Sequence, residues 1–247
     1  MKAIILCGGF AKRLGSIAQD KPKTLLDMNG KPLLMHILEN LATVDAIDHI
    51  FISTNQKFGR HLEDFAKTLN LEKKLTVIVE PAMREDEKLG SIGGLHFLIT
   101  SQGIDDDCLV INGDNLLFFT LPDFVLFAAK KQGSALAVWD APSRDEAKKF
   151  GVVTVNQEGK IIGFEEKPEN PKTLLVSTGC YFFSKHDVMN IDLYIREGND
   201  KDKTGNFIAW LSTRKNVYAY QSGKPWFDIG DPQTLENARQ FLQNVTQ

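Results

Sequence analysis

KAIILCGGFAKRL, residues 2–14, is the first indication of the fold class of this chain. Its first part, Lys2–Cys7, is an apolar, isoleucine-rich run that stops at two glycines, which is typical of a buried strand in a parallel sheet. Pro32–Leu41 then carries apolar residues at helical spacing, with its proline suited to the first turn of a helix. A strand, a loop and a helix in this order predict the start of a βαβ unit.

Strands and helices keep alternating to about residue 140. We expect strands at 47–53, 75–80, 108–112 and 134–138, and helices at 56–69, 91–99 and 121–131. Alternation at this spacing predicts an open, mostly parallel sheet with helices on both faces. The expected fold class is therefore α/β, with a Rossmann-like open mixed sheet.

Beyond residue 140 the pattern becomes strand-rich, which predicts antiparallel strands in the second half of the chain. We expect strands at 150–155, 160–166, 174–183 and 217–220, and helices at 207–213 and 231–243. The polar run 195–206 predicts a solvated loop. No repeat or linker interrupts the chain, so we expect both halves to share one sheet in a single domain.

The composition describes a soluble globular protein, with 43% hydrophobic and 25% charged residues among 247. A net charge of −3 leaves no global basic field, which disfavours a nucleic acid polymer as partner. No apolar run is long enough for a signal segment or a membrane span. Three widely spaced cysteines, Cys7, Cys108 and Cys180, lack metal-ligand spacing, so we expect reduced core thiols in a cytoplasmic protein.

The loop after the first strand, Gly8–Lys23, is long, and an ordered loop of this length is usually functional. Its glycines allow backbone N–H groups to approach phosphate oxygens, and its cations can neutralise their charge. The loop matches neither the dinucleotide fingerprint nor the Walker A pattern, which counts against an NAD-dependent oxidoreductase. Taken alone, the same residues are equally compatible with a simple turn and surface cations.

The segment GGFAKRL…KPKTLLDMNGKPLL, residues 8–34, resembles the signature of the sugar-1-phosphate nucleotidyltransferases. Five later motifs agree in order and spacing: NGDN at 112–115, FGVV at 150–153, EEKP at 165–168, STG at 177–179 and WFDIGDPQTLENA at 226–238. One departure is Ala11-Lys12, which stands where the family has Gly-Thr. The resemblance implies transfer of a nucleotidyl group from a nucleoside triphosphate to a sugar-1-phosphate, giving a nucleotide-sugar and pyrophosphate.

Two aspartates match the magnesium-binding positions of that family. Asp114 follows the strand at 108–112, and Asp228 precedes the closing helix. Because Mg²⁺ binds one or two carboxylates together with phosphate oxygens and water, this pair is sufficient to hold it. The structural alternative is that Asp114 belongs to a turn and Asp228 caps a helix.

Three cations complete the catalytic set implied by the resemblance. Arg13 would hold the β and γ phosphates, where its planar fork suits several oxygens. Lys23 would contact the α-phosphate, and Lys167 the phosphate of the sugar-1-phosphate. Such a reaction depends on alignment and on neutralising charge at the α-phosphorus.

Further residues follow from the same resemblance. Glu166, Gly151 and Thr178 would contact the sugar, and the nucleotide would be bound by Leu6, Gly8, Gly9, Glu80, Gly90, Ser91 and Gly113. Gly90 and Ser91 lie in LGSIGGL, residues 89–95, which resembles a turn that binds the base through backbone groups.

Two positions bear on the choice of base. Glu80 stands where the thymidylyltransferase branch has glutamine, and Thr24 also replaces a glutamine of that branch. A carboxylate only accepts hydrogen bonds, so Glu80 favours a base with an amino donor, guanine or cytosine, over thymine or uracil.

The resemblance also sets expectations for the whole protein. We expect one domain over residues 1–247, with a nucleotide-binding part at about 1–140, a sugar-phosphate-binding part at about 141–230 and a closing helix at 231–243. No C-terminal extension is expected, hence one activity, which would supply precursors for glycans or cell-surface polysaccharides. The family often forms homo-oligomers. The alternative is a catalytically silent regulatory subunit that binds a nucleotide-sugar, although the chain keeps both aspartates and the phosphate-binding cations.

Overall fold

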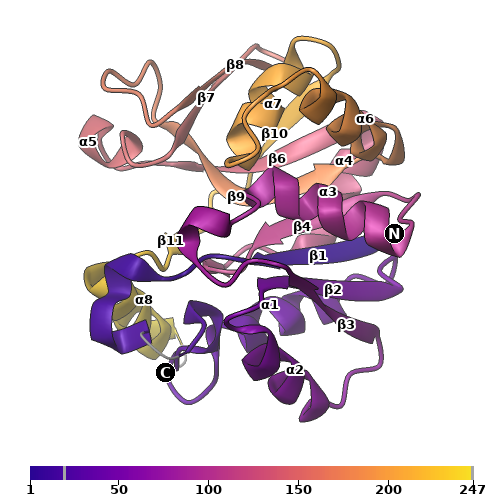
Figure 1. The fold of residues 1–247 in the computed structure, drawn as a ribbon. Helices are drawn as coiled ribbons and strands as arrows, with labels where there is room; N and C mark the ends of the chain where they lie inside the picture. Colours follow the sequence, from indigo (N-terminus) through magenta and orange to yellow (C-terminus); the bar gives the residue numbers. More distant parts are fainter. Residues whose placement is uncertain (19–20, 246–247) are drawn as a thin grey trace.

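The first strand of the computed structural model, β1 (Lys2–Cys7), lies between β2 (His49–Asn55) and β4 (Cys108–Asn112) and is parallel to both. β3 (Lys74–Glu80) continues the sheet beyond β2, again in parallel. The model describes residues 1–18 and 21–245. Because these four strands run the same way, their carboxyl ends share one edge of the sheet (Figure 1).

The second half of the chain extends the same sheet from its other side. β9 (Leu175–Phe183) runs antiparallel to both β4 and β6 (Ser134–Asp140), and β10 (Val217–Gln221) is parallel to β6. β7 (Gly151–Val155) and β8 (Ile161–Glu166) form an antiparallel pair that joins the sheet through β9. The strand order β10-β6-β9-β4-β1-β2-β3 confirms the expected mixed α/β fold.

Helices cover both faces of the sheet. One group comprises α1 (Leu33–Ala42), α2 (Gly59–Lys67) and α4 (Leu121–Lys131), and the other α3 (Ser91–Gln102), α6 (Lys185–Arg196) and α7 (Thr204–Ser212). Successive side chains of a strand point to opposite faces. In β1, Ile4 accordingly packs in the core beneath α3, α6 and α7, while Ile5 packs in the core beneath α1, α2 and α4.

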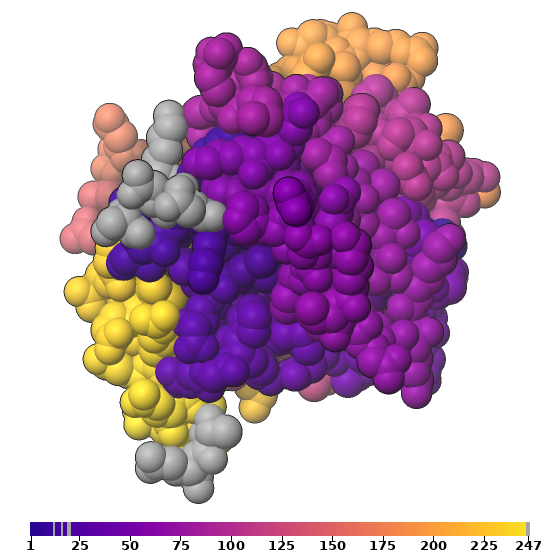
Figure 2. Space-filling view, turned by 60° about the horizontal axis from the view of Figure 1, so that its bottom comes forward, coloured from indigo at the N-terminus to yellow at the C-terminus, as the bar shows by residue number. Residues whose placement is uncertain are grey.

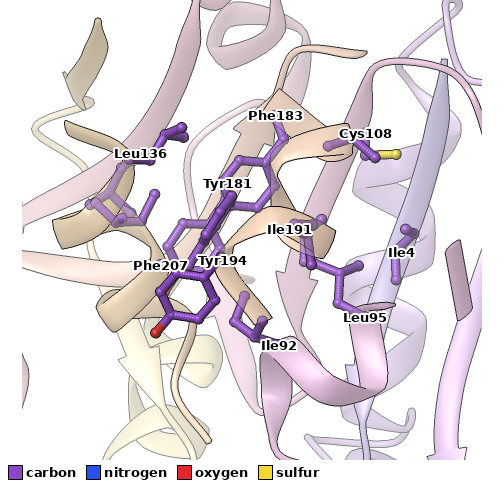
Figure 3. Close-up of a cluster of buried hydrophobic side chains, with 14 of the residues drawn as sticks. Ile4, Ile92, Leu95, Cys108, Leu136, Tyr181, Phe183, Ile191, Tyr194 and Phe207 are labelled. Atoms are coloured by element: carbon purple, nitrogen blue, oxygen red, sulfur yellow. The ribbon is translucent and has the colours of Figure 1, made fainter. Parts of the chain in front are cut away.

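An aromatic cluster attaches α6 and α7 to the sheet (Figure 3). The ring of Phe207 lies 5.4 Å from that of Phe183 on β9 and 5.3 Å from that of Tyr194 on α6. Tyr181 stacks on Phe183 at 5.7 Å. These large buried rings pack α6 and α7 against the sheet and thereby position the loop between the two helices, residues 197–203.

A smaller sheet lies beside the first. β5 (Asn115–Leu117) pairs antiparallel with β11 (Trp226–Asp228), and α8 (Pro232–Val245) follows. Leu14, Ile229 and Leu235 share a core there, which packs α8 against the short helix η1 (Lys12–Ala18). Figure 2 shows the C-terminal segment lying against the N-terminal one.

Several local elements differ from the sequence prediction. The loop predicted at 195–206 is confined to 197–203, because α6 ends at Arg196 and α7 begins at Thr204. α6 was not predicted, since its apolar positions are interrupted by charged and amide side chains. The loop predicted at Gly8–Lys23 contains η1, and its residues 19–20 lie outside the described part of the chain.

Short helices also occur at α5 (Arg144–Ala147), η2 (Lys23–Leu25) and η3 (Glu85–Glu87). The three cysteines are buried and form no disulfide. Within residues 1–18 and 21–245, none of the helices has the length and apolar character needed to cross a membrane.

Candidate active site

A cavity of about 340 Å³ opens at the carboxyl edge of the sheet. Ligands of open α/β folds bind at this edge. Most of the predicted site residues line it: Leu6, Gly8, Gly9, Lys23, Glu80, Gly90, Ser91, Asp114, Gly151, Glu166, Lys167, Thr178 and Asp228. Arg13 and Gly113 are not among the lining residues.

Two aspartates that are distant in sequence meet at this cavity. The pairing of β5 with β11 places Asp228 opposite Asn115, and the N–H of Ile229 donates to the carbonyl oxygen of Asp114 at 2.8 Å. Burial raises the pKa of Asp228 to about 7, and the negative charge of Asp114 adds to this effect. The shift reflects two carboxyl groups that share one buried site.

Lys23 supplies the compensating charge at these carboxyl groups. It follows Pro22, opens η2, and its ammonium group pairs with the carboxylate of Asp114. Burial opposes the ionisation of Asp114, but the charge of Lys23 overcomes it and holds the pKa of Asp114 below its ordinary value. Burial acts to lower the pKa of Lys23, but the charge of Asp114 acts in the opposite direction and the pKa lies above its ordinary value. One ammonium group against two carboxylates leaves room for a further cation.

Arg13 lies at the edge of this cluster, outside the cavity lining. A methyl group added at Gly230 would come within 3.0 Å of its guanidinium nitrogen, so the glycine permits this close approach. The charge of Arg13 acts to lower the pKa of Asp228, against the larger effects that raise it. Ala11, two residues earlier, has φ of 54°, a left-handed conformation that favours glycine. The backbone thus keeps a glycine-like conformation at the position where the sequence departs from the family signature.

Glu80 lies at the nucleotide end of the cavity and is 6% exposed. The hydroxyl of Ser53 donates to its Oε1 at 2.6 Å. A methyl group added at Gly94 would lie 2.4 Å from the same oxygen, so glycine is needed there for Glu80 to occupy this place. Burial raises the pKa of Glu80, and the hydrogen bond from Ser53 partly offsets it.

Two positions considered with the nucleotide site face the protein interior instead. A methyl group added at Gly113 would lie 2.6 Å from the sulfur of Cys7 and 2.8 Å from Thr24, so Gly113 permits close packing of the chain after β4. Thr24 is 1% exposed and does not line the cavity. Thr24 therefore has no surface in this cavity through which it would contact a base.

The sugar end of the cavity is built from β7, β8 and β9. Glu166 ends β8, and Lys167 follows with φ of 48°, its N–H donating to the carbonyl of Phe150 at 3.0 Å. The hydroxyl of Thr178 donates to the carbonyl of Ala137 at 2.9 Å. Because this proton is already engaged, the Thr178 hydroxyl would accept, and not donate, a hydrogen bond with a sugar hydroxyl.

The loop at 197–203 adds residues that the sequence analysis missed. Asp202 and Lys203 line the cavity, and the ammonium nitrogen of Lys203 lies 3.6 Å from Oε1 of Glu166. The N–H of Ser91, expected to face the base, donates instead to the carbonyl of Asp202 at 3.0 Å. The polar, charged composition of this loop indicates solvent exposure and carries no motif, so its role depends on tertiary contacts.

The donor set limits which metal site is feasible. No cluster of three or more histidine, cysteine, aspartate and glutamate side chains arranged to hold a metal is found in the described part of the chain. A site at Asp114 and Asp228 would thus offer two carboxylates and take its remaining ligands from substrate and water. This oxygen-only set suits Mg²⁺.

Comparisons with known proteins agree with this geometry. A family model described as nucleotidyl transferase matches residues 2–245. The chain is 30% identical to the bifunctional protein GlmU of Methanocaldococcus jannaschii, over 98% of this chain and 54% of GlmU. It is 28% identical to the UTP–glucose-1-phosphate uridylyltransferase AglF of Haloferax volcanii, over 100% of this chain and 98% of AglF.

Two further matches bear on length and fold. A mannose-1-phosphate guanylyltransferase of Mycobacterium tuberculosis is 25% identical over 94% of this chain and 61% of its own length. The chain thus spans little more than half of some relatives and nearly all of AglF. The structure of a UDP-glucose pyrophosphorylase bound to UDP-glucose matches with a TM-score of 0.83 at 19% identity, covering 99% of this chain and 98% of that one. This last match shows a shared fold.

Proposed function

The chain belongs to the nucleotidyl transferase family, and from this membership we propose that it is a sugar-1-phosphate nucleotidyltransferase. It would transfer a nucleotidyl group from a nucleoside triphosphate to a sugar-1-phosphate and release pyrophosphate. One observation carries the proposal: a single cavity is lined by Lys23, Asp114 and Asp228 at one end and by Glu166 and Lys167 at the other. These cations and carboxylates are the groups that two phosphorylated substrates would require in one cavity.

Asp114 and Asp228 are the residues proposed to hold Mg²⁺. They are buried together beside the single ammonium group of Lys23, and burial together with the charge of Asp114 raises the pKa of Asp228. When bound, Mg²⁺ would supply charge neutralisation at the triphosphate oxygens. Lys23, which pairs with Asp114, would also contact the α-phosphate once the nucleotide is bound.

The reaction needs no covalent enzyme intermediate. An oxygen of the sugar-1-phosphate attacks the α-phosphorus, the bond from this phosphorus to the bridging oxygen breaks, and that oxygen leaves with pyrophosphate. Lys167 would hold the attacking phosphate, and Arg13, which lies against Gly230, would stabilise the departing pyrophosphate. Most of the rate enhancement would then come from alignment and preorganised charge.

Recognition of the base and sugar is proposed at opposite ends of the cavity. Glu80, buried with only Oε1 engaged by Ser53, would accept a hydrogen bond from an amino group of guanine or cytosine. Glu166 would accept hydrogen bonds from sugar hydroxyls. Among the relatives named above, AglF is a uridylyltransferase and the Mycobacterium tuberculosis protein is a guanylyltransferase, so the proposed choice of base rests on Glu80. The product would serve as a precursor for glycan or cell-surface polysaccharide synthesis.

A matrix of nucleoside triphosphates against sugar-1-phosphates, with pyrophosphate release as the signal, tests the activity. We expect turnover that depends on Mg²⁺ and is higher with GTP or CTP than with dTTP or UTP. A strong preference for dTTP would contradict the assignment of Glu80. Absence of pyrophosphate release with every pair would contradict the activity itself.

Two variants connect the activity to the site. Asp114→Asn and Lys167→Ala should each lower kcat/KM by about 10²-fold or more, since each removes a charge proposed at a reacting phosphate. Lys130→Ala, a change in the last turn of α4 outside the cavity lining, is the matched control and should leave turnover unchanged. Unaltered turnover in Asp114→Asn would contradict the proposed metal site, whereas a wild type that binds a nucleotide-sugar without any turnover would favour the silent regulatory alternative.

A further inference from the structure

The loop at residues 197–203 is tied by its backbone to the nucleotide half of the cavity. The carbonyl of Lys201 accepts the N–H of Ile92 at 3.0 Å, and the carbonyl of Asp202 accepts the N–H of Ser91 at 3.0 Å. The hydroxyl of Ser91 also donates to Asp202 at 3.0 Å. The first N–H groups of α3, which a helix leaves without internal partners, are thereby satisfied by this loop.

Side chains hold the same loop on both sides of Lys203. Asp202 forms an ion pair with Lys88 at 3.0 Å. Thr204, which begins α7, donates its hydroxyl to the hydroxyl of Ser91 at 3.0 Å. Lys203 therefore projects from a backbone that is anchored at the preceding and the following residue. Such anchoring fixes the position from which its side chain extends.

Lys203 reaches the sugar half of the cavity. Its ammonium nitrogen lies 3.6 Å from Oε1 of Glu166, and both residues line the cavity. The side chain of Glu166 is only 21% exposed, so its carboxylate is less screened than one on an open surface.

Charge at the sugar end explains why Glu166 needs this partner. A phosphate monoester carries about −1.5 to −2 charge at neutral pH. Glu166 adds a negative charge directly beside Lys167, the one cation that the sequence motif supplies there. Lys149 also lines the cavity, but Lys203 is the cation that pairs with this carboxylate, and its charge reduces the repulsion between Glu166 and the incoming phosphate.

We propose that Lys203 is a positioning residue for the sugar half of the site: it neutralises and orients Glu166, and its anchored loop joins this half to α3. This inference rests on the proposed function. Glu166 held in this way can accept hydrogen bonds from sugar hydroxyls without opposing the phosphate. The loop at 197–203 thus contacts both halves of the cavity through one short segment.

The test compares Lys203→Met with Lys201→Met. Lys201 lies on the same loop, but its side chain lines a different cavity with His96 and Phe97, so its substitution makes the same change of charge away from Glu166. Glucose 1-phosphate and mannose 1-phosphate are titrated calorimetrically against both variants and the wild type. KM for the sugar-1-phosphate and for the nucleotide is then measured with whichever pair turns over.

We expect Lys203→Met to weaken binding of the sugar-1-phosphate, and to raise its KM, by about tenfold. Its KM for the nucleotide should stay within about twofold, and Lys201→Met should match the wild type. Lys203→Arg should restore most of the lost affinity, because it keeps the positive charge. A general loss of stability would not produce this selective pattern.

The failures of the two proposals are distinguishable. If the wild type binds neither sugar-1-phosphate and no pair turns over, both the proposed function and this inference are wrong. If the wild type turns over and Lys203→Met keeps its affinity for the sugar-1-phosphate, only the inference is wrong. An equal rise of both KM values would also overturn it, since that result indicates a merely structural role.

Discussion

Replacing Gly90 by alanine tests whether the loop at 197–203 is fixed as the structure indicates. Gly90 precedes α3 with φ of 78° and ψ of 165°, a conformation essentially confined to glycine. A methyl group there would lie 2.4 Å from the carbonyl oxygen of Lys201 and 2.5 Å from Cα of Asp202. Both atoms belong to backbone that is hydrogen-bonded to α3, so the substitution must displace this loop.

The expected cost follows from two effects. The backbone conformation costs an alanine about 1–3 kcal/mol. Relief of the overlap requires a displacement of about 1 Å, which lengthens the hydrogen bonds from Ser91 and Ile92 beyond useful range. Their loss adds about 0.5–1.5 kcal/mol each. We expect Gly90→Ala to lower the free energy of unfolding by roughly 2–6 kcal/mol.

Gly103→Ala is the matched control for this change. Gly103 ends the same helix with φ of 58°, yet no atom outside its immediate neighbours lies within 4 Å of an added methyl group. Its substitution should cost only about 1–2 kcal/mol. Urea unfolding measures both variants, and an unchanged m-value shows that the folded and unfolded states stay comparable. Equal destabilisation by the two changes would refute the proposed anchoring. Gly90→Ala should also weaken sugar-1-phosphate binding, since the displaced loop carries Lys203.

Three further outcomes are expected. Phe207→Ala should lower the free energy of unfolding by about 3–5 kcal/mol, measured by urea denaturation, because the ring is fully buried in the aromatic cluster. Mg²⁺ should raise the melting temperature of the EDTA-treated wild type but not of Asp114→Asn; equal responses would argue against the two-carboxylate site. Glu80→Gln should be more stable than the wild type at about pH 8 and similar to it at about pH 4. Burial raises the pKa of Glu80 in the folded state. Protonated Glu80 therefore contributes to the stability of the fold at pH values below its unfolded pKa, and this contribution is lost as the pH rises through its folded pKa. A constant difference across melting curves at both pH values would contradict this.

Local patterns predicted the elements of the sheet well. Cys108–Asn112 and Leu121–Lys131 have the bounds expected from apolar runs and helical spacing. α6 was not predicted because its buried residues Val188, Ile191 and Tyr194 form only a narrow stripe among polar residues. The small sheet of β5 and β11 was not predicted, because each strand is only 3 residues long and is too short to show the alternation of apolar and polar residues.

The candidate site was predictable only in part. Short motifs carry Lys23, Asp114 and Lys167, and the last two each follow a strand whose local pattern is clear. The alternation of strands and helices also predicted that such ends would meet at one edge, since parallel strands share their carboxyl ends. No motif marks Lys203, because its proposed role comes from its contact with Glu166, which lies far away in the sequence at the end of β8.

Local sequence patterns suffice to predict the α/β class, the order of the main elements and the residue types available for phosphate chemistry, because hydrophobic period and glycine placement act over a few neighbouring residues. The tertiary structure alone decided which of those residues meet. The approach of Asp228 to Asp114, of Arg13 to Gly230 and of Lys203 to Glu166 depends on packing between distant segments. Contacts of this kind are set by the whole core, and no local stretch of sequence specifies them.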